Sequence, residues 1–564
     1  RAASNAFLNG SVTSFENDVT TETCPATCSD DYKAVVGCNG VPIMTCNDDQ
    51  LCAAGVCKPA CEAVKENRSS VGCEYYPLAM LGYGGALKGC YAVFVANTWG
   101  TAAHVSFERS GTPLNASSFG RLPSGTGSSL TYGPFDPTSG IAPGEVAIFF
   151  LQGSTDGGTF GAVPCPAGIT PAFPDGTQIA GTGIGEAFHL TSDVPVVAYQ
   201  MLPYGGGSAA VTGASLLLPT SAWHTNYVAV NAYKQSQAAG TSPSLNLVAM
   251  EDGTSITLLP KAAVVGGAGV PSGAANAPLT FTLNRGQHAQ ITQPAELTGS
   301  PIESSHPIGL MAGHECLNVP ANASYCDHAE QQIPPVRALG SEYACVTHRQ
   351  RAAKAENPPW RIIGAVDSTA LTFEPAAVHA AATIGLGEIL ELTTAEPFVV
   401  KSQDADHPFL VTTYMTGSST VQDGYGDADF VRIVPSGQYL RRYVFFTDPS
   451  YPETNLVVVR RKDAKGQFQA VNLDCSGDLA GWQALGASGN YEYTRTDLIR
   501  HDFQGQNGCS NGRREMKSDA PFGLWVWGWG TPETKIFTEN VSYGYPAGEN
   551  VVQINEVFVP PTPK

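Results

Sequence analysis

SDVPVVAYQ, at residues 192–200, recurs in altered form three more times along this chain. Each copy contains a short polar run, a proline and then an apolar run. The later copies are SSHPIGLMA at 304–312, DADHPFLVT at 404–412 and KSDAPFGLW at 517–525. The four prolines, Pro195, Pro307, Pro408 and Pro521, are separated by 112, 101 and 113 residues. A period of this length predicts tandem domains of one kind.

The run after each proline is apolar at both alternating positions. This pattern predicts a central strand that is covered on both faces, with the proline at its start, where a missing N–H is tolerated. A second landmark precedes the last three copies and consists of a proline, a large side chain and a tyrosine at intervals of four residues. The three examples are Pro219, Trp223 and Tyr227; Pro335, Leu339 and Tyr343; and Pro435, Tyr439 and Tyr443. We expect each to be a connector that plugs a junction and leads into the first strand of a repeat, and we expect the first repeat to start at Tyr91.

The composition also favours β-structure. The 564 residues include 61 glycines and 40 prolines, only 14% of them are charged, and no long pattern of helical period is present. Each repeat has room for about seven short strands, which is typical of a small sandwich. The sequence therefore predicts an all-β fold, with four tandem β-sandwich-like repeats behind a small disulfide-rich module. A propeller-like closure of the four units is the alternative.

The expected organisation follows from these landmarks. It comprises an extended tail at 1–23, a cysteine-rich module at 24–61, repeats at 62–215, 216–329, 330–430 and 431–535, and a C-terminal strand and tail at 536–564. The stretch VVQINEVFV at 551–559 is expected to be a strand that completes a sheet of this chain or of a neighbouring molecule.

Cysteine usage indicates the compartment. Fifteen cysteines are present, and nine of them lie between Cys24 and Cys90. This density predicts a disulfide framework and an oxidising compartment. The framework of the module involves Cys24, Cys28, Cys38, Cys46, Cys52, Cys57 and Cys61. The alternative is a zinc site, but the segment lacks histidines and paired C-x2-C knuckles. The odd total leaves a thiol that is free, paired between chains, or paired with a segment outside these residues.

Two later cysteine pairs are also expected to form disulfides, Cys316 with Cys326 and Cys475 with Cys509. The first pair is flanked by His314 and His328, so a metal site with two thiolates and two imidazoles is the alternative. An oxidising compartment favours the disulfide.

Three aspartates, Asp423, Asp427 and Asp429 in QDGYGDADF, offer clustered oxygen ligands of the kind that calcium prefers. Their spacing differs from the EF-hand pattern. The alternative is a solvated turn, where Asp and Gly are common. Calcium is the one cofactor that the sequence suggests.

Three tryptophans alternate at Trp525, Trp527 and Trp529, so in a strand they share one face. If that face is exposed, the indole rings could stack on sugar rings and bind a glycan. If it is buried, the three rings belong to the core or to a seam between repeats, and the apolar residues at the matching offset of the other copies favour this second interpretation.

Several function classes are disfavoured. The net charge is −19 and no basic cluster is present, which argues against nucleic acid as a partner. No apolar run reaches about 18 residues, so we expect no membrane span in this sequence. Neither an HExxH motif nor a GxSxG nucleophile elbow is present, so we expect a non-enzymatic protein.

Five stretches together resemble the N-terminal domain of IgGFc-binding proteins and occur in the order found in that family. They are GCEYYPLAM (72–80), ASLLLPTSAWHTNYVAV (214–230), GHECLNVPANASYCDHAEQQIPPV (313–336), KSDAPFGLWVWGWG (517–530) and SYGYPAG (542–548). The resemblance covers roughly residues 62–550. A cysteine-rich lead such as 24–61 resembles that of large bacterial surface proteins. The resemblance implies a secreted or surface-attached binding or adhesion module, and it does not imply that this chain binds immunoglobulin.

We therefore expect an extracellular bacterial surface protein with a structural or adhesive role, such as a subunit of a surface filament or sheath. Its expected partners are copies of itself or other surface proteins. The segments 1–23 and 551–564 are candidates for strand exchange between subunits. The alternative is a monomeric cell-surface receptor that binds glycans or proteins.

Overall fold

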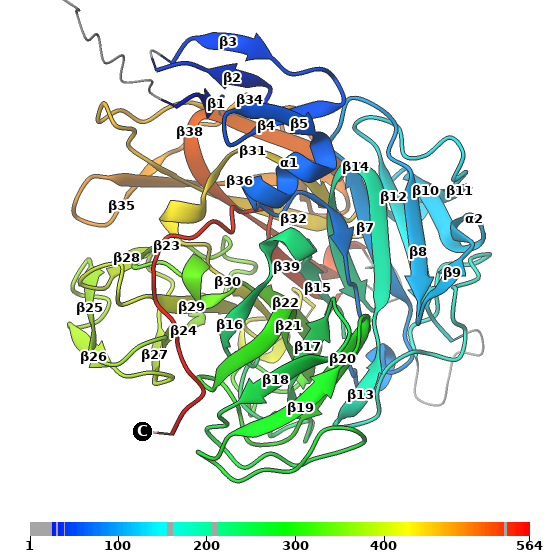
Figure 1. The fold of residues 1–564 in the computed structure, drawn as a ribbon, viewed down its shortest axis with the longest axis vertical. Coiled ribbons are helices and arrows are strands. Elements are labelled where there is room, and N and C mark those ends of the chain that lie inside the picture. Colours follow the sequence, from blue (N-terminus) through cyan, green and yellow to red (C-terminus); the bar gives the residue numbers. More distant parts are fainter. Residues whose placement is uncertain are drawn as a thin grey trace, which may run out of the picture. The chain divides into compact units, whose positions relative to one another are not determined.

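The computed structural model describes residues 25–29, 32–38, 40–154, 162–205, 211–422, 424–534 and 539–563. Two compact units are present, one ending at Lys58 and the other beginning at Pro59 (Figure 1). Strands predominate in both units, and the predicted all-β fold class is confirmed.

The first unit has small sheets and little apolar core. Strands β1 (Thr27–Cys28), β2 (Ala34–Val36) and β3 (Pro42–Thr45) form one sheet, and β4 (Gln50–Ala53) pairs with β5 (Val56–Pro59). Its core consists of Val35, Cys46 and Cys52. Disulfides join Cys28 to Cys52 and Cys46 to Cys57, and Cys38 is also disulfide-bonded. Cys24 lies outside the described residues. Disulfides therefore supply stability that burial of apolar side chains cannot supply in so small a unit.

The second unit begins with helix α1 (Ala60–Asn67), which the Cys61–Cys73 disulfide ties to strand β6. Four similar sets of antiparallel strands follow. Repeat 1 contains β6 (Gly72–Tyr75), β7 (Tyr91–Asn97), β8 (Val105–Arg109), β9 (Thr112–Leu114), β12 (Val146–Gln152), β14 (Phe188–Leu202) and β15 (Gly213–Leu216), with β10 (Gly120–Ser124) and β11 (Thr131–Pro134) added at an edge. Repeat 2 contains β16 (His224–Val228), β17 (Pro243–Ala249), β18 (Thr254–Leu258), β19 (Leu279–Leu283), β20 (Gln287–Thr292), β21 (Pro301–Leu317) and β22 (Asp327–Ile333), and β13 (Gly183–Glu186) pairs with β20.

The other two repeats follow the same order. Repeat 3 contains β23 (Glu342–Cys345), β24 (Pro359–Gly364), β25 (Thr369–Glu374), β26 (Ala382–Ile384), β27 (Ile389–Thr393), β28 (Phe398–Lys401), β29 (Phe409–Met415) and β30 (Asp429–Arg432). Repeat 4 contains β31 (Leu440–Thr447), β32 (Glu453–Arg461), β33 (Val471–Leu473), β34 (Gly477–Asp478), β36 (Tyr491–Arg500), β38 (Gly512–Trp529) and β39 (Ser542–Pro546), with β35 (Gln483–Leu485) and β37 (Gln504–Gly505) at the edges of β36.

The recurring proline lies inside a long strand in three of the repeats. In β14, residues 188–192 pair with β8, whereas residues 196–201 pair with β7. Pro195 lies where the partners change, and Pro307 in β21 and Pro521 in β38 hold the same position. In repeat 3 the strand is interrupted, and Pro408 directly precedes β29. The prediction of a proline at the start of the strand is therefore wrong for three copies. The missing N–H is tolerated because the ladder is broken there.

A tyrosine hydroxyl fixes each long strand just after its proline. Tyr227, Tyr343 and Tyr443 each donate a hydrogen bond to the carbonyl of the residue after the proline, namely Ile308, Phe409 and Phe522. In repeat 1 the donor is Tyr75, which bonds the carbonyl of Val196. The first strand of repeat 1 is thus β6, and the expected start at Tyr91 is wrong because β7 is the equivalent of the second strand.

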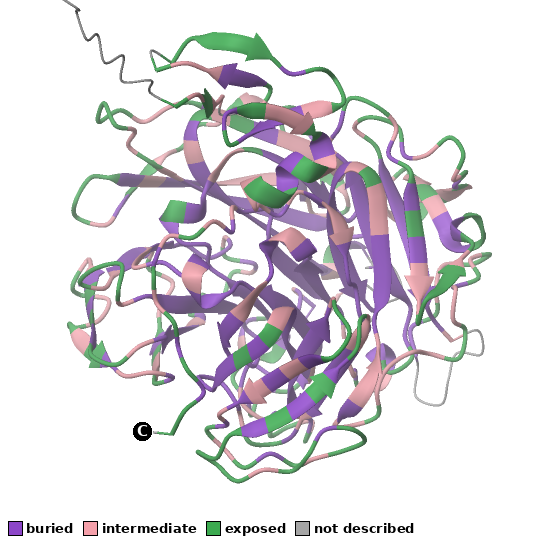
Figure 2. Ribbon diagram, in the orientation of Figure 1, coloured by how far each residue is buried: buried purple, intermediate pink, exposed green. Residues whose placement is uncertain are grey.

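The last strands of the four repeats close into a ring. β15 packs against β22, β22 against β30, β30 against β39, and β39 against β15 (Figure 1). Gln331 Nε2 donates to the carbonyls of Ala214 and Gly544, at 3.0 and 2.8 Å, and so links three of these strands. These inner strands are buried throughout (Figure 2). The arrangement is the propeller-like closure that the sequence left as an alternative. The expected boundaries at 329/330 and 430/431 fall inside β22 and β30.

The segment 551–563 lies along its own unit without forming a strand. The Val551 amide donates to the Arg68 carbonyl, the Ile554 amide to the Arg337 carbonyl, and the Val559 amide to Asn226 Oδ1. Val551 and Val559 are buried. The predicted strand at 551–559 is therefore wrong, because this extended segment is held by isolated hydrogen bonds and apolar contacts instead of a ladder.

Candidate functional site

The three tryptophans lie in the core. Trp525, Trp527 and Trp529 are at most 1% exposed, because their part of β38 runs between β32 and β39. Trp525 Nε1 donates to the Arg432 carbonyl, and the rings of Trp527 and Trp529 pack against His348. The interpretation as a sugar-binding ladder on the surface is wrong, and the rings fill the seam between repeats 3 and 4.

The aspartates do not form a solvated turn. Asp427 and Asp429 are buried at the ring, where Asp427 Oδ1 accepts from the Ser418 amide and Asp429 Oδ1 from the Phe430 amide. Burial raises the pKa of Asp429 well above its ordinary value. Asp423 lies outside the described residues. Among the residues that the structure describes, no three His, Cys, Asp or Glu side chains come close enough to hold a metal ion.

A buried polar cluster links the repeats at the same place. Ser542 Oγ donates to Asp327 Oδ2 and to the Asp427 carbonyl, at 3.1 and 2.8 Å. Burial, and next the charge of Asp427, raises the pKa of Asp327 well above its ordinary value. Ser542 of repeat 4 thus links Asp327 of repeat 2 to Asp427 of repeat 3.

The later cysteines are paired as disulfides. Cys316 is bonded to Cys326, and Cys475 to Cys509, and a further bridge joins Cys90 to Cys165. With both sulfurs of the Cys316–Cys326 pair in a disulfide, the thiolates required for the alternative metal site are absent. Burial lowers the pKa of His314 to about 3, so its ring is neutral, and its Nδ1 accepts from the Cys316 amide. The free thiol in the described part of the chain is that of Cys345, which is fully buried.

A cavity of about 370 Å³ lies between repeats 1 and 4. Repeat 1 contributes residues 123–126, at the end of β10 and in the turn that follows it, and residues 144–146, at the start of β12. Repeat 4 contributes Phe446, Pro449 and the segment 510–513, where β38 begins. The two walls are joined by the Gly127 amide, which donates to the Pro449 carbonyl at 2.8 Å. We regard this cavity as the candidate binding site.

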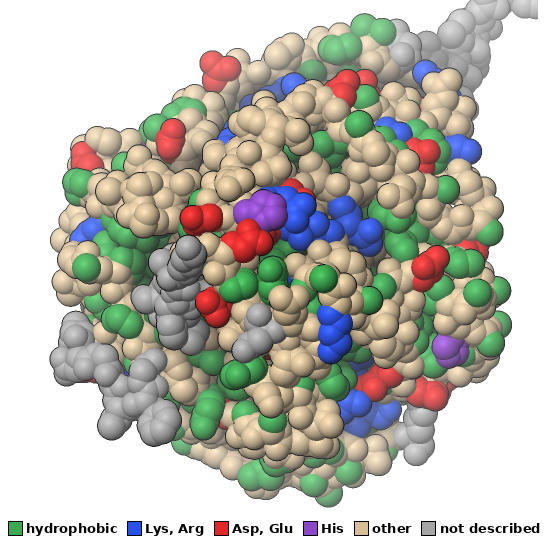
Figure 3. Space-filling model, turned by 180° about the vertical axis from the view of Figure 1, so that it is seen from behind, with side chains coloured by type: hydrophobic (Ala, Val, Ile, Leu, Met, Phe, Trp, Pro, Cys, Tyr) green, Lys and Arg blue, Asp and Glu red, His purple; other side chains and the backbone are tan. Residues whose placement is uncertain are grey.

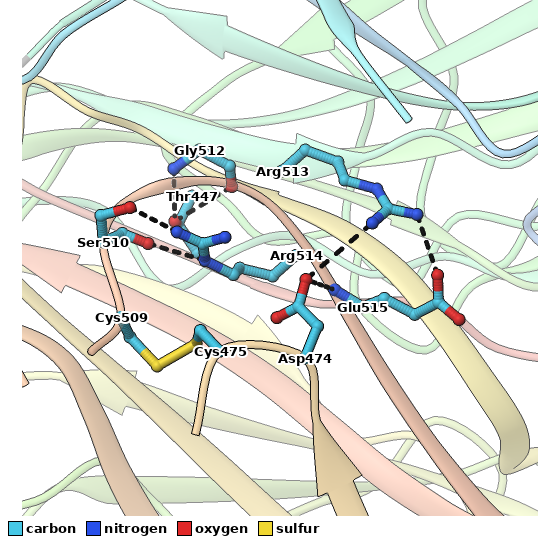
Figure 4. The surroundings of a disulfide bond; sticks show 9 residues. All are labelled: Thr447, Asp474, Cys475, Cys509, Ser510, Gly512, Arg513, Arg514 and Glu515. Carbon is cyan, nitrogen blue, oxygen red and sulfur yellow. Dashed lines mark hydrogen bonds and ion pairs between the residues drawn. A yellow bond between two sulfur atoms is a disulfide. The ribbon is translucent and has the colours of Figure 1, made fainter. Parts of the chain in front are cut away.

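A disulfide and an ion-pair network fix the repeat 4 wall (Figure 4). The Cys475–Cys509 bond holds the chain directly before 510–513. Arg513 extends from β38 on the side opposite to Arg514, and its Nη2 donates to Glu515 Oε2 at 2.9 Å. Asp474 Oδ2 lies 3.9 Å from Arg513 Nη1 and accepts from the Glu515 amide.

The charges of this network balance. Arg442 also donates to Glu515, at 2.9 Å, and this hydrogen bond holds the pKa of Glu515 below its ordinary value. With Arg514, which donates to the lining residue Ser510, and Glu145, which lines the cavity, three arginines and three carboxylates lie at or beside it. On the face drawn in Figure 3, basic and acidic side chains lie in small mixed groups. The surroundings of the cavity therefore favour hydrogen bonding to a neutral group over attraction of a strongly charged one.

The sequence did not reveal this cavity. Its walls come from four segments that are as far apart as residues 123 and 513, and they meet because repeat 4 closes the ring onto repeat 1. Cys475 and Cys509 were the only predicted site residues near it. The repeat pattern could have located the seam, but not the side chains that line it.

Comparisons with known proteins give the family. The family model described as "IgGFc binding protein" matches residues 213–528, and the human IgGFc-binding protein is 24% identical over 290 residues. That alignment covers 51% of this chain but only 5% of the human protein. No solved structure matches. None of the helices in the described residues is long and apolar enough to cross a membrane. The family match begins at the first residue of β15, ends within β38 and covers more than half of the chain, so the chain belongs to the IgGFc-binding protein family.

Proposed function

We propose that this protein is a non-enzymatic structural or adhesive component of the cell surface, in which the ring of repeats serves as a rigid binding module. Membership of the family indicates an extracellular binding or structural protein. The disulfides agree with an oxidising exterior. The finer role, adhesion or assembly on the surface of a bacterial cell, is the proposal.

The observation that carries this proposal is the closed ring. The buried Arg432 guanidinium bonds the Glu549 carboxylate and, through Nε, the Gln332 carbonyl at 2.7 Å. Together with the segment 551–563, this contact ties repeats 2, 3 and 4 into one body. A body of this kind presents turns at the seams in fixed positions, as a surface-binding module requires.

The structure bears on two expected routes of self-association, which are exchange of the C-terminal segment and a disulfide between chains. Exchange of 551–563 between subunits would first break the contacts of this segment with Arg68, Arg337 and Asn226. Because Cys345 is buried, it does not support a disulfide between chains. Self-association into a filament or sheath would therefore use another surface.

Electron microscopy of the native material tests the proposal. Negative-stain images that show filaments or sheaths support a structural subunit. Single particles that adhere to immobilised cell-surface extracts support an adhesive receptor. Single particles that bind none of these extracts would reject both roles.

A second candidate is binding of an immunoglobulin Fc region, favoured by the name of the human protein and by its 24% identity to this chain. The human match spans a small part of that protein, so this activity is a proposal for the present chain. Biolayer interferometry with human IgG Fc tests it. Saturable binding that a Fab fragment does not reproduce supports Fc recognition, and a flat response at micromolar Fc rejects it.

A further inference from the structure

We propose that the cavity between repeats 1 and 4 binds a neutral saccharide. This inference rests on the surface-binding role proposed above and gives that role a site and a class of ligand. It replaces the buried tryptophans as the place where a glycan would be held.

The cavity is preformed. Its volume of about 370 Å³ lies within the range of roughly 300–1,000 Å³ that is usual for small-molecule sites. The walls are held relative to each other by the Gly127–Pro449 hydrogen bond. Phe503 also packs closely against the backbone of Gly127. A Cβ added to this glycine would lie only 2.9 Å from Phe503 Cε2. A ligand therefore meets walls that need little ordering, which reduces the entropic cost of binding.

The lining offers both donors and acceptors. Ser124, Thr126 and Ser510 supply hydroxyl groups, and Asn511 supplies an amide. Phe446 and Pro449 also line the cavity, but both are buried, so they offer little apolar surface to a sugar ring. Saccharide hydroxyls both donate and accept, so they match such a mixed lining better than a ligand with acceptors only, such as a phosphate.

Asn511 is the most specific indication of a ligand. Its Nδ2 donates to the carbonyls of Asp448 and Tyr451, both at 2.9 Å, which fixes the amide plane. Its Oδ1 has no hydrogen-bond partner in the described part of the chain, although the residue is only 7% exposed. A buried polar atom is expected to have a partner, and Asn511 is one of the residues that line the cavity. A ligand hydroxyl could fill this role.

The charge beside the cavity favours a neutral ligand. The Arg513 guanidinium is already bonded to Glu515 and faces Asp474, so it is not available as an unpaired cation for a carboxylate or sulfate. Gly512 adds open space, because no atom lies within 4 Å of where its Cβ would be. A bulky ring can approach the backbone at this point without a clash.

A peptide fits the cavity less well. Extended peptides usually bind by adding a strand to an open sheet edge. The wall strand β10 pairs with β11 along residues 121–124 and with β12 at Gly120 and Arg121, which leaves only the short edge 122–124 for an added strand. The remaining lining consists of turns and strand ends, which suit a compact ligand.

A glycan array with the full chain tests this inference. The array carries neutral hexose and N-acetylhexosamine oligosaccharides, their carboxylated and sulfated counterparts, and short peptides. We expect saturable binding to at least one neutral oligosaccharide. The exposed Ser124 lies at the rim, and Ser124→Trp would fill the cavity and should weaken that binding by at least about tenfold.

One variant serves as a matched control. Ser128→Trp places the same bulky side chain on an exposed position of the neighbouring turn, outside the cavity, and should bind as the wild type does. Melting temperatures of all variants should match, because each altered position is exposed.

Each outcome decides the inference. The inference is supported if Ser124→Trp loses binding while Ser128→Trp keeps it. Binding that survives Ser124→Trp, binding of acidic glycans or peptides only, or no binding to any glycan overturns it. The surface role can still hold in those cases, because filaments or adhesion to cell-surface extracts are measured independently.

Discussion

The two units of this protein reach stability by different routes. The unit that ends at Lys58 has a core of three residues and depends on disulfides. The ring unit buries long apolar strands from four repeats and adds buried polar links such as Arg432–Glu549. In the first unit the disulfides act mainly by lowering the conformational entropy of the unfolded chain. In the second, the folded state itself supplies most of the stability. The contrast can be tested by removing comparable links from each unit.

The largest effect is expected from a matched pair of disulfide deletions. Cys46–Cys57 and Cys316–Cys326 close loops of nearly equal length, with sequence separations of 11 and 10. The loss of loop-closure entropy is then similar, on the order of 3 kcal/mol in each case. We expect Cys46→Ser with Cys57→Ser to unfold the first unit completely, whereas Cys316→Ser with Cys326→Ser should leave the ring folded.

Hydrogen exchange measured by mass spectrometry separates these outcomes. In the first double variant, amides of β2 should exchange as fast as in an unfolded peptide. In the second, amides of β21 away from the bridge should stay protected. Persistent protection of β2 without its bridge would show that the first unit has a core strong enough to fold alone, and the contrast would fail.

The next largest effect is expected at the ring closure. Glu549→Ala would leave the buried Arg432 guanidinium without its carboxylate, and removal of one partner of a buried pair costs about 3–5 kcal/mol. Chemical denaturation at neutral pH measures the loss. Lys234→Ala provides the control, because its ion pair with Glu391 is exposed and should contribute no more than about 1 kcal/mol.

A double variant sharpens this test. Arg432→Met with Glu549→Leu removes both charges together and should recover much of the stability lost in Glu549→Ala. If Glu549→Ala were no more damaging than Lys234→Ala, the buried pair would not close the ring in the manner described.

The smallest expected effect concerns pH. Burial raises the pKa of Asp448 to about 6, although the hydroxyl and amide of Ser450 oppose the shift. Because the folded-state pKa lies above the unfolded one, the contribution of this group to stability is complete below about pH 4. It is lost as the pH rises through about 6. The difference is on the order of 3 kcal/mol.

Asp448→Asn should remove this part of the pH dependence. Unfolding free energies of the wild type and the variant are measured from pH 4 to pH 7. Between about pH 4 and pH 6 the wild type should lose stability relative to the variant as the pH rises, and above about pH 6 the two slopes should be equal. The exposed Asp463 provides a control, and Asp463→Asn should leave the slope between pH 4 and pH 6 as it is in the wild type. Parallel curves for Asp448→Asn and the wild type would contradict the assignment.

Features that depend on neighbouring residues could be predicted from the sequence. The proline landmarks located the four repeats and the central strands, and the plugging residues Trp223, Leu339 and Tyr439 are buried as expected. Alternation placed Trp525, Trp527 and Trp529 on one face. It could not tell whether that face was covered, because the covering residues come from other parts of the chain.

Features that depend on closure of the ring were beyond sequence reasoning. Asp427 and Asp429 have the composition of a solvated turn, yet they are buried because Asp327 and Ser542 converge on them from other repeats. The tail 551–563 has the alternating pattern of a strand, but it binds by single contacts, such as those of Val551 with Arg68 and of Val559 with Asn226. The cavity arises from the same closure and therefore left no local signal.

The closed ring also sets an order for folding during synthesis or export. β15, β22 and β30 are complete by Arg432, but β39, which packs between β30 and β15, begins only at Ser542. Until that strand has emerged, the inner strands of the first three repeats lack one neighbour, and the hydrogen bond from Gln331 of the polar strand β22 to the Gly544 carbonyl cannot form. The final repeat therefore completes the buried polar network at the centre of the ring.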